Sequence, residues 1–127
     1  MTQLLALAIT LALEVPVALL LGKRVFSLPI SAWRLAAVAA ATSLITHPVV
    51  WPLMTMWMAR APLWQRALVG EGLAVAIEAL IYWKAVPMTG RQGFLTSFCA
   101  NAFSYGLGLV IGTRIYVWAN VLRGWLS

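Results

Sequence analysis

The feature that most constrains this chain is a series of four long apolar segments, separated only by short polar breaks. They span about residues 4–22, 32–58, 63–84 and 91–117, and a bilayer core of ~30 Å takes roughly 20 helical residues to cross. Of the 127 residues, 63% are hydrophobic and 9% are charged, whereas a soluble domain carries roughly 25% charged residues. Because short connections make consecutive helices antiparallel neighbours, the sequence predicts an all-α polytopic membrane protein. We expect an antiparallel four-transmembrane-helix bundle with a polar centre, forming a single transmembrane domain over residues 1–127.

The positive charge and the tryptophans fit the two edges of such a bundle. The net charge is +6, but the Lys and Arg residues lie in short clusters between apolar runs. This distribution is typical of loops that face anionic lipid headgroups, not of a nucleic-acid interface. Tryptophan prefers the same headgroup layer, and most of the tryptophans fall near predicted segment ends: Trp33, Trp57, Trp64, Trp83 and Trp118. We therefore expect a multi-pass protein of the cell's inner (plasma) membrane, in contact with the lipid bilayer and with no nucleic-acid partner.

All acidic residues of the chain lie inside the apolar segments. The acids are Glu14, Glu71 and Glu78, the one histidine is His47, and the connecting loops contain no acid. An ionisable residue near the bilayer centre costs about 2.5–3.5 kcal/mol on insertion scales, so such residues normally face the bundle interior and pair there. This placement is the strongest indication of function in the sequence.

Helical spacing puts these residues on stripes of small or polar side chains. Residues three and four apart share one face of a helix, and small stripes let membrane helices approach closely. The first segment carries such a stripe at every fourth residue: Ala6, Thr10, Glu14, Ala18 and Gly22. The last segment carries a packing ridge of Ala100, Ser104, Gly108 and Gly112, with Asn101 beside it. If every stripe points inward, a polar centre forms from Glu14, His47, Glu71, Glu78 and Asn101.

Several roles remain open for this centre. His47 either hydrogen-bonds to a glutamate and locks its helix, or ligates a metal ion with Glu71 and Glu78, since imidazole and carboxylates suit several transition metals. A third option is axial ligation of a haem or chlorin pigment, with Trp51 one turn away. The glutamates either form a proton or cation pathway or, when neutral, join helices by hydrogen bonds. The cofactor is therefore unknown, with a metal cation and a pigment or haem as candidates.

No catalytic motif supports an enzymatic function. A di-iron carboxylate bundle needs two Glu-x-x-His pairs, whereas this chain has one histidine and Leu44 stands three residues before it. A His-Glu-x-x-His sequence, a Gly-x-Ser-x-Gly sequence and a glycine-rich phosphate loop are all absent from the chain. Catalysis therefore has no specific support, and no catalytic residue is predicted.

The polar residues of the last three segments also form a pattern that resembles a known group of proteins. Its elements are Thr46-His47-Pro48 with Trp51, Glu71 and Glu78 with Tyr82, and Ala100-Asn101 with Ser104. The pattern resembles small bacterial four-helix integral membrane proteins of unassigned function. The resemblance implies a four-helix fold and points to the same polar residues, but it brings no activity with it.

Two classes of function follow from these features. In the first, the chain is an accessory or scaffolding subunit of a larger membrane complex, and its Glu/His/Asn cluster locks the bundle or holds a cofactor. In the second, it is a small homo-oligomeric carrier or channel that moves protons or a metal cation past the glutamates and His47. The small-residue ridge, the many tryptophans and the lack of a soluble module favour a subunit that docks against other membrane proteins.

Overall fold

The computed structural model describes residues 2–126, which fold into four α-helices with no β-strand among them. The helices are α1 (Gln3–Leu19), α2 (Ala32–Pro52), α3 (Leu63–Ala85) and α4 (Gly90–Leu126). Two short π-helical segments, η1 (Leu20–Val25) and η2 (Leu53–Trp57), extend α1 and α2. The prediction of an all-α fold with four helices is confirmed.

The helix ends follow the sequence breaks, with one exception. α1, α2 and α3, with their π-helical extensions, begin and end within a few residues of the predicted segments. α4 instead continues to Leu126, well past residue 117. No proline follows Pro87 in the sequence, so nothing removes a backbone donor from the later turns. At 37 residues, α4 is about 55 Å long, which exceeds the roughly 30 Å of a bilayer core.

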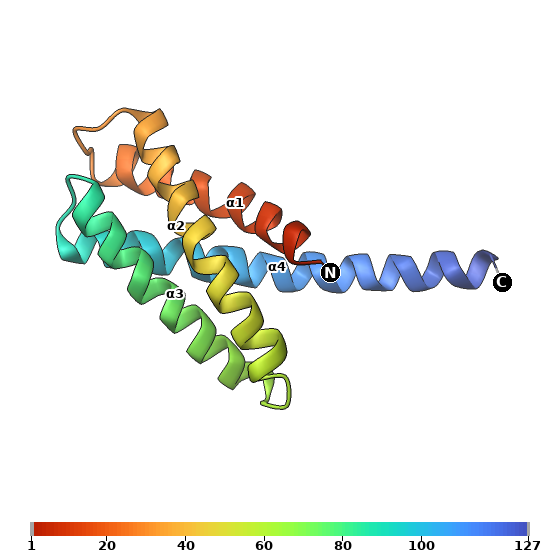
Figure 1. Cartoon of the computed structure of the whole chain (residues 1–127). Coiled ribbons are helices and arrows are strands. Elements are labelled where there is room, and N and C mark those ends of the chain that lie inside the picture. The colour runs from red at the N-terminus through yellow and green to blue at the C-terminus, as the bar shows by residue number, and fades with distance from the viewer. Residues whose placement is uncertain (1, 127) are drawn as a thin grey trace.

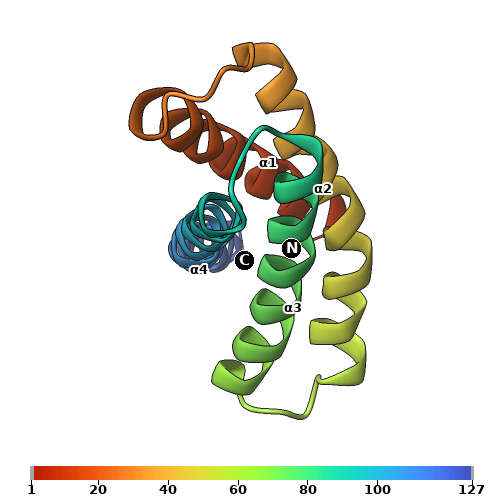
Figure 2. The same cartoon turned by 90° about the vertical axis from the view of Figure 1, so that its left-hand side faces the viewer.

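The four helices form a ring in which consecutive helices run in opposite directions (Figure 1). α1 and α3 each pack against both α2 and α4. Figure 2 shows this arrangement along α4, with α1 on one side of it and α3 on another. The α1–α2 and α3–α4 connections lie at the same end, and from there the helices diverge (Figure 1). We call this the closed end, and the opposite end, with the α2–α3 connection and the free half of α4, the open end.

Each π-helical segment follows a proline. Pro16 stands four residues before η1, and Pro52 stands directly before η2. In both segments an amide donates to the carbonyl five residues earlier: Phe26 to Leu21 at 2.8 Å and Met58 to Leu53 at 2.9 Å. Such wide turns are rare and locally interrupt the regular α-helical ladder. They end α1 near the closed end and α2 near the open end.

An apolar core occupies the closed end. It contains a cluster of buried side chains: Ala18, Leu28, Leu35, Ala39, Tyr82, Val86 and Met88. The α1–α2 loop is tied to this core by the ammonium group of Lys23, which donates to the carbonyls of Leu28 and Ile30. Burial of this cluster holds the helix ends together and leaves the middle of the bundle for the polar residues.

Three of the helical stretches are long and apolar enough to cross a membrane: Gln3–Val25, Ala32–Trp57 and Gly90–Arg123. α3 is also long enough, with 23 residues, but it carries Glu71, Glu78 and Lys84 within one bilayer-length window. By length and composition, three of the four helices in the described residues could therefore span a membrane. The crossing of α3 depends on how its two glutamates are accommodated.

Candidate functional site

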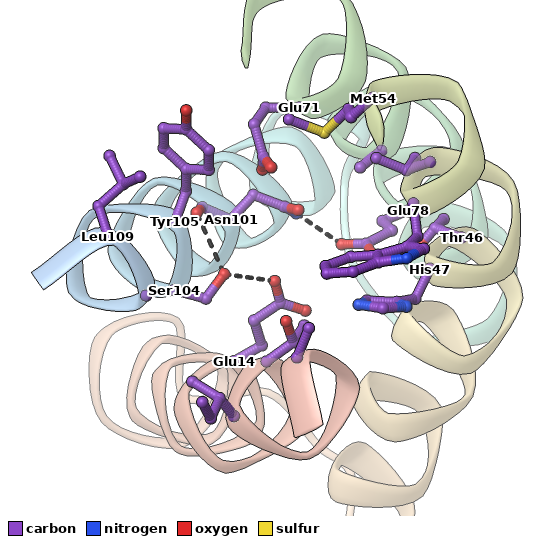
Figure 3. A pocket seen from close by; sticks show the side chains of 17 residues that line it. Glu14, Thr46, His47, Met54, Glu71, Glu78, Asn101, Ser104, Tyr105 and Leu109 are labelled. Carbon is purple, nitrogen blue, oxygen red and sulfur yellow. Dashed lines mark hydrogen bonds between the residues drawn. The ribbon is translucent and has the colours of Figure 1, made fainter. Parts of the chain in front are cut away.

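A cavity of about 190 Å³ lies between the four helices, on the open-end side of the apolar core (Figure 3). All four helices contribute to its wall, and every residue of the predicted polar centre lines it: Glu14, His47, Glu71, Glu78 and Asn101. Of the predicted ridge, Ser104 and Gly108 also line it. The inward-facing stripes thus bring together residues that are distant in the sequence.

Glu14 joins α1 to two other helices. Its side chain is 3% exposed, and each carboxyl oxygen accepts one short hydrogen bond. The Ser43 hydroxyl of α2 donates to Oε2 at 2.6 Å, and the Ser104 hydroxyl of α4 donates to Oε1 at 2.6 Å. Figure 3 shows Glu14 pointing from α1 into the space between the helices, with its bond to Ser104.

Glu78 plays the same structural role for α3. It is 2% exposed and accepts hydrogen bonds at 2.7 Å from the Thr46 hydroxyl of α2 and from the Asn101 amide of α4. The Ser97 hydroxyl makes a longer hydrogen bond to Glu78, at 3.4 Å, and also donates at 3.0 Å to the carbonyl of Val75. We call these two sets of hydrogen bonds the clamps. The Glu14 clamp joins α1 to α2 and α4, and the Glu78 clamp joins α3 to the same two helices.

Glu71 is different from the other two glutamates. It is half-buried and lines the cavity two turns from Glu78 on the same face of α3. No side-chain hydrogen bond is formed to its carboxyl group within residues 2–126. Figure 3 shows its carboxyl group directed into the cavity. Glu71 is thus the carboxyl group left available for a ligand.

Aromatic rings form another part of the cavity wall. His47 and Trp51, one turn apart on α2, stack with ring centroids 5.6 Å apart and an interplanar angle of 16°. The Nδ1 atom of His47 is buried and has no hydrogen-bond partner in the described structure, and the same holds for the Tyr105 hydroxyl. His47 therefore does not lock α2 to a glutamate through Nδ1. Axial ligation of a haem or chlorin by His47 stays a prediction.

The metal hypothesis gains no support from this geometry. Within residues 2–126, no group of three or more His, Cys, Asp or Glu side chains is arranged to hold a metal ion. His47, Glu71 and Glu78 share the cavity but do not converge on one point. A transition-metal site needs several such ligands around the ion at about 2 Å.

The predicted packing ridge of α4 divides into two parts. Ala100 and Ser104 are buried against the other helices. At Gly108 and Gly112, by contrast, a Cβ atom would meet no atom of another described helix within 4 Å, so these glycines do not mediate close packing among the described helices. The close contact of α4 is at Gly93, where a Cβ atom would lie 2.9 Å from the carbonyl oxygen of Ala79 on α3.

Some residues of the site were missed by sequence reasoning. Ser97, Tyr105 and Gly93 were not predicted to matter, although Ser97 stands four residues before Asn101 and so shares its helix face. That spacing is a signal that could have found Ser97. The same spacing extends to Gly93, four residues before Ser97, and to Tyr105, four residues after Asn101, so both share this face of the helix.

The resemblance to small bacterial four-helix membrane proteins rests on several of the polar residues that line the cavity, but it does not include Glu14. That resemblance brings no activity with it and stays a prediction. No known protein family, curated protein or solved structure matches the chain, so its function has to be inferred from the cavity itself.

Proposed function

We propose that this chain is a multi-pass membrane protein that takes up and releases a proton or another cation at the glutamates of its central cavity, as a small carrier. The membrane is proposed to be the cell's inner (plasma) membrane, and the carrier a homo-oligomer, because four helices alone enclose only a narrow path. The observation that carries the proposal is the arrangement of hydrogen bonds around Glu14 and Glu78, next to the unbonded carboxyl group of Glu71.

Membrane insertion is supported by the outer surface of the bundle. Trp64 and Trp83 lie near the two ends of α3 and are 65% and 48% exposed. At 1.5 Å per residue they are separated by about 29 Å along the helix, which matches the hydrocarbon thickness of roughly 30 Å. At the closed end, Lys84 and Arg34 lie over the rings of Trp83 and Trp33, as expected for an aromatic belt beside lipid headgroups.

The clamps are built so that a carboxyl group can gain or lose a proton without leaving a donor unsatisfied. Each hydroxyl that donates to a glutamate has a second acceptor, which for Ser43, Thr46 and Ser104 is a carbonyl of its own helix. The Ser43 hydroxyl lies 3.3 Å from the carbonyl of Ala39, the Thr46 hydroxyl 3.0 Å from that of Thr42, and the Ser104 hydroxyl 3.2 Å from that of Asn101. A protonated carboxyl group could donate to such a hydroxyl, which would then turn to its backbone acceptor.

The absence of a basic partner favours cation binding. Every hydrogen bond to Glu14 and Glu78 in the described structure comes from a neutral hydroxyl or amide group, and no Lys or Arg lines the cavity. Unpaired charges are costly in a low-dielectric interior. Three carboxyl groups around one cavity therefore favour the uptake of protons or of another cation.

Proton flux into liposomes tests this function. The full chain is reconstituted into liposomes that contain the pH dye pyranine, and a potassium diffusion potential is imposed with valinomycin. We expect faster proton entry than in protein-free liposomes, and at least a tenfold loss with Glu71→Gln. Because Glu71 makes no side-chain hydrogen bond among the described residues, this variant should keep its helicity by circular dichroism. Trp57→Phe, at an exposed position outside the cavity, is the matched control. Equal flux in wild type and Glu71→Gln would contradict the proposal.

The free half of α4 favours a second candidate, an accessory or scaffolding subunit. Beyond the open end, α4 runs past the other helices (Figure 1) and exposes large apolar side chains, among them Tyr116, Trp118 and Leu122. Such a surface could pack against other membrane subunits. Native mass spectrometry of the particle extracted in mild detergent from its own membranes tests this: a heteromeric particle supports the subunit function, and a homo-oligomer contradicts it.

A further inference from the structure

The volume of the cavity exceeds what a proton or a bare ion needs. At about 190 Å³, it is larger than an engineered protein cavity of about 150 Å³ that binds benzene. It would hold about six water molecules at roughly 30 Å³ each. An organic molecule of about five to seven non-hydrogen atoms therefore fits.

The chemistry of the wall selects a cation among such molecules. Glu71 presents a carboxyl group to which no other side chain of residues 2–126 forms a hydrogen bond, and the stacked rings of His47 and Trp51 form an aromatic surface in the same cavity. A carboxylate and an aromatic face together suit an organic ammonium ion, which is attracted to both. An anion would meet no Lys or Arg in the wall. These two features are independent of the clamps formed by Glu14 and Glu78.

The outer surface of the bundle provides a route to Glu71. A separate apolar groove of about 420 Å³ runs between α3 and α4 and contains the stacked rings of Phe94 and Phe98. Glu71 and Asn101 line both this groove and the central cavity. The two spaces therefore adjoin at these two residues, so a ligand in the groove lies next to Glu71.

We infer that the central cavity binds a small organic ammonium ion, held between the Glu71 carboxylate and the His47–Trp51 pair, which enters between α3 and α4. The inference rests on the proposed cation-carrier function and names its substrate class. The ammonium ion replaces a proton at Glu71, so that the cavity stays close to the same net charge when the ligand leaves and a proton returns.

Calorimetry with tetramethylammonium chloride tests the inference. The full chain in lipid nanodiscs is titrated at neutral pH, with potassium chloride at equal ionic strength as the reference ion. We expect saturable binding of one tetramethylammonium ion per chain and none of potassium. Glu71→Gln should weaken binding at least tenfold, and Trp51→Leu roughly three- to tenfold, through loss of the cation–π contact. Trp51→Phe retains an aromatic ring, so it should lose less affinity than Trp51→Leu. It replaces Trp51→Leu in the test if the leucine variant disturbs the fold. Trp57→Leu, on the same helix outside the cavity, should bind as the wild type does.

The outcomes separate this inference from the proposed function. Saturable binding that Glu71→Gln weakens supports the inference. No saturable binding by the wild type overturns it, and so does equal affinity in Glu71→Gln. If the wild type carries protons in the liposome assay without binding tetramethylammonium, the inference is overturned and the carrier function stands. If it does neither, both are overturned.

Discussion

Glu78→Ala should destabilise the bundle more than Glu71→Ala, although both changes remove the same atoms from the same helix. Glu78 accepts two interhelical hydrogen bonds at 2.7 Å, from Thr46 and Asn101, whereas Glu71 accepts no side-chain hydrogen bond in the described structure. Because both variants place alanine inside α3, the change in helix propensity is the same for the two and cancels. The difference between them therefore measures the clamp.

The expected difference is about 1–2 kcal/mol in the free energy of unfolding. Interhelical hydrogen bonds in membrane proteins contribute about 0.6 kcal/mol on average and about 1.7 kcal/mol at most, and Glu78 loses two. For two bonds we take the lower half of the summed range, because neither Thr46 nor Asn101 is left without an acceptor when the carboxyl group of Glu78 is removed. Thr46 can turn to the carbonyl of Thr42 at 3.0 Å, and the Asn101 amide keeps the carbonyl of Ser97 at 2.9 Å.

Reversible unfolding in mixed dodecylmaltoside and SDS micelles, followed by far-ultraviolet circular dichroism, gives the two free energies. Glu78 is more deeply buried than Glu71, so part of the difference could come from packing. Thr46→Val separates the two effects, because it removes one hydrogen bond at nearly constant volume. In a double-mutant cycle, Thr46→Val and Glu78→Ala should couple by about 0.6 kcal/mol or more. Equal destabilisation by Glu78→Ala and Glu71→Ala, together with zero coupling, would refute the clamp.

Three further predictions concern α4 and the ligand. Gly93→Ala should destabilise the α3–α4 contact by about 1–3 kcal/mol through overpacking, because the new Cβ atom would lie 2.9 Å from a backbone oxygen of α3; Gly106→Ala, which meets nothing within 4 Å, should be neutral or stabilising in the same unfolding assay. Acidification should weaken tetramethylammonium binding in calorimetry, because a proton and the ammonium ion compete for the carboxylate of Glu71. Ala102→Trp should fill the groove between α3 and α4 and slow tetramethylammonium association in stopped-flow fluorescence, with a smaller effect on affinity; unchanged association would argue against entry by this route.

Periodicity in the sequence predicts which face of a helix is buried, and it does so well here. In α1 the stripe at every fourth residue lies inward, with Ala6, Glu14 and Ala18 all buried. The spacing works because residues four apart stack on one side of a helix whatever its neighbours are. The same logic placed the predicted polar residues of all four helices around one cavity.

Periodicity in the sequence does not predict how far one helix is shifted along the next. Glu71 and Glu78 share a stripe and look equivalent in the sequence, yet one is clamped by two helices and the other is not. Which of them meets a donor depends on how far α3 slides along α2 and α4. That offset is set by contacts such as the close approach at Gly93. Periodicity places Gly93 on the same face as Ser97 and Asn101, but it does not predict which residue of α3 lies opposite. The division of the glutamates into clamping and available groups therefore needed the structure.

Both clamps act on a single turn of α4. Ser104, which bonds Glu14, and Asn101, which bonds Glu78, are three residues apart on that helix. The Ser104 hydroxyl also lies 3.2 Å from the carbonyl of Asn101, so the two donors are connected to each other. Protonation or deprotonation of either glutamate therefore alters the hydrogen bonds of the same turn of α4. The same holds for α2, where Ser43, which bonds Glu14, and Thr46, which bonds Glu78, are also three residues apart and the Thr46 hydroxyl lies 3.5 Å from the carbonyl of Ser43. The charge in the cavity therefore acts on one turn of α2 and on one turn of α4 together.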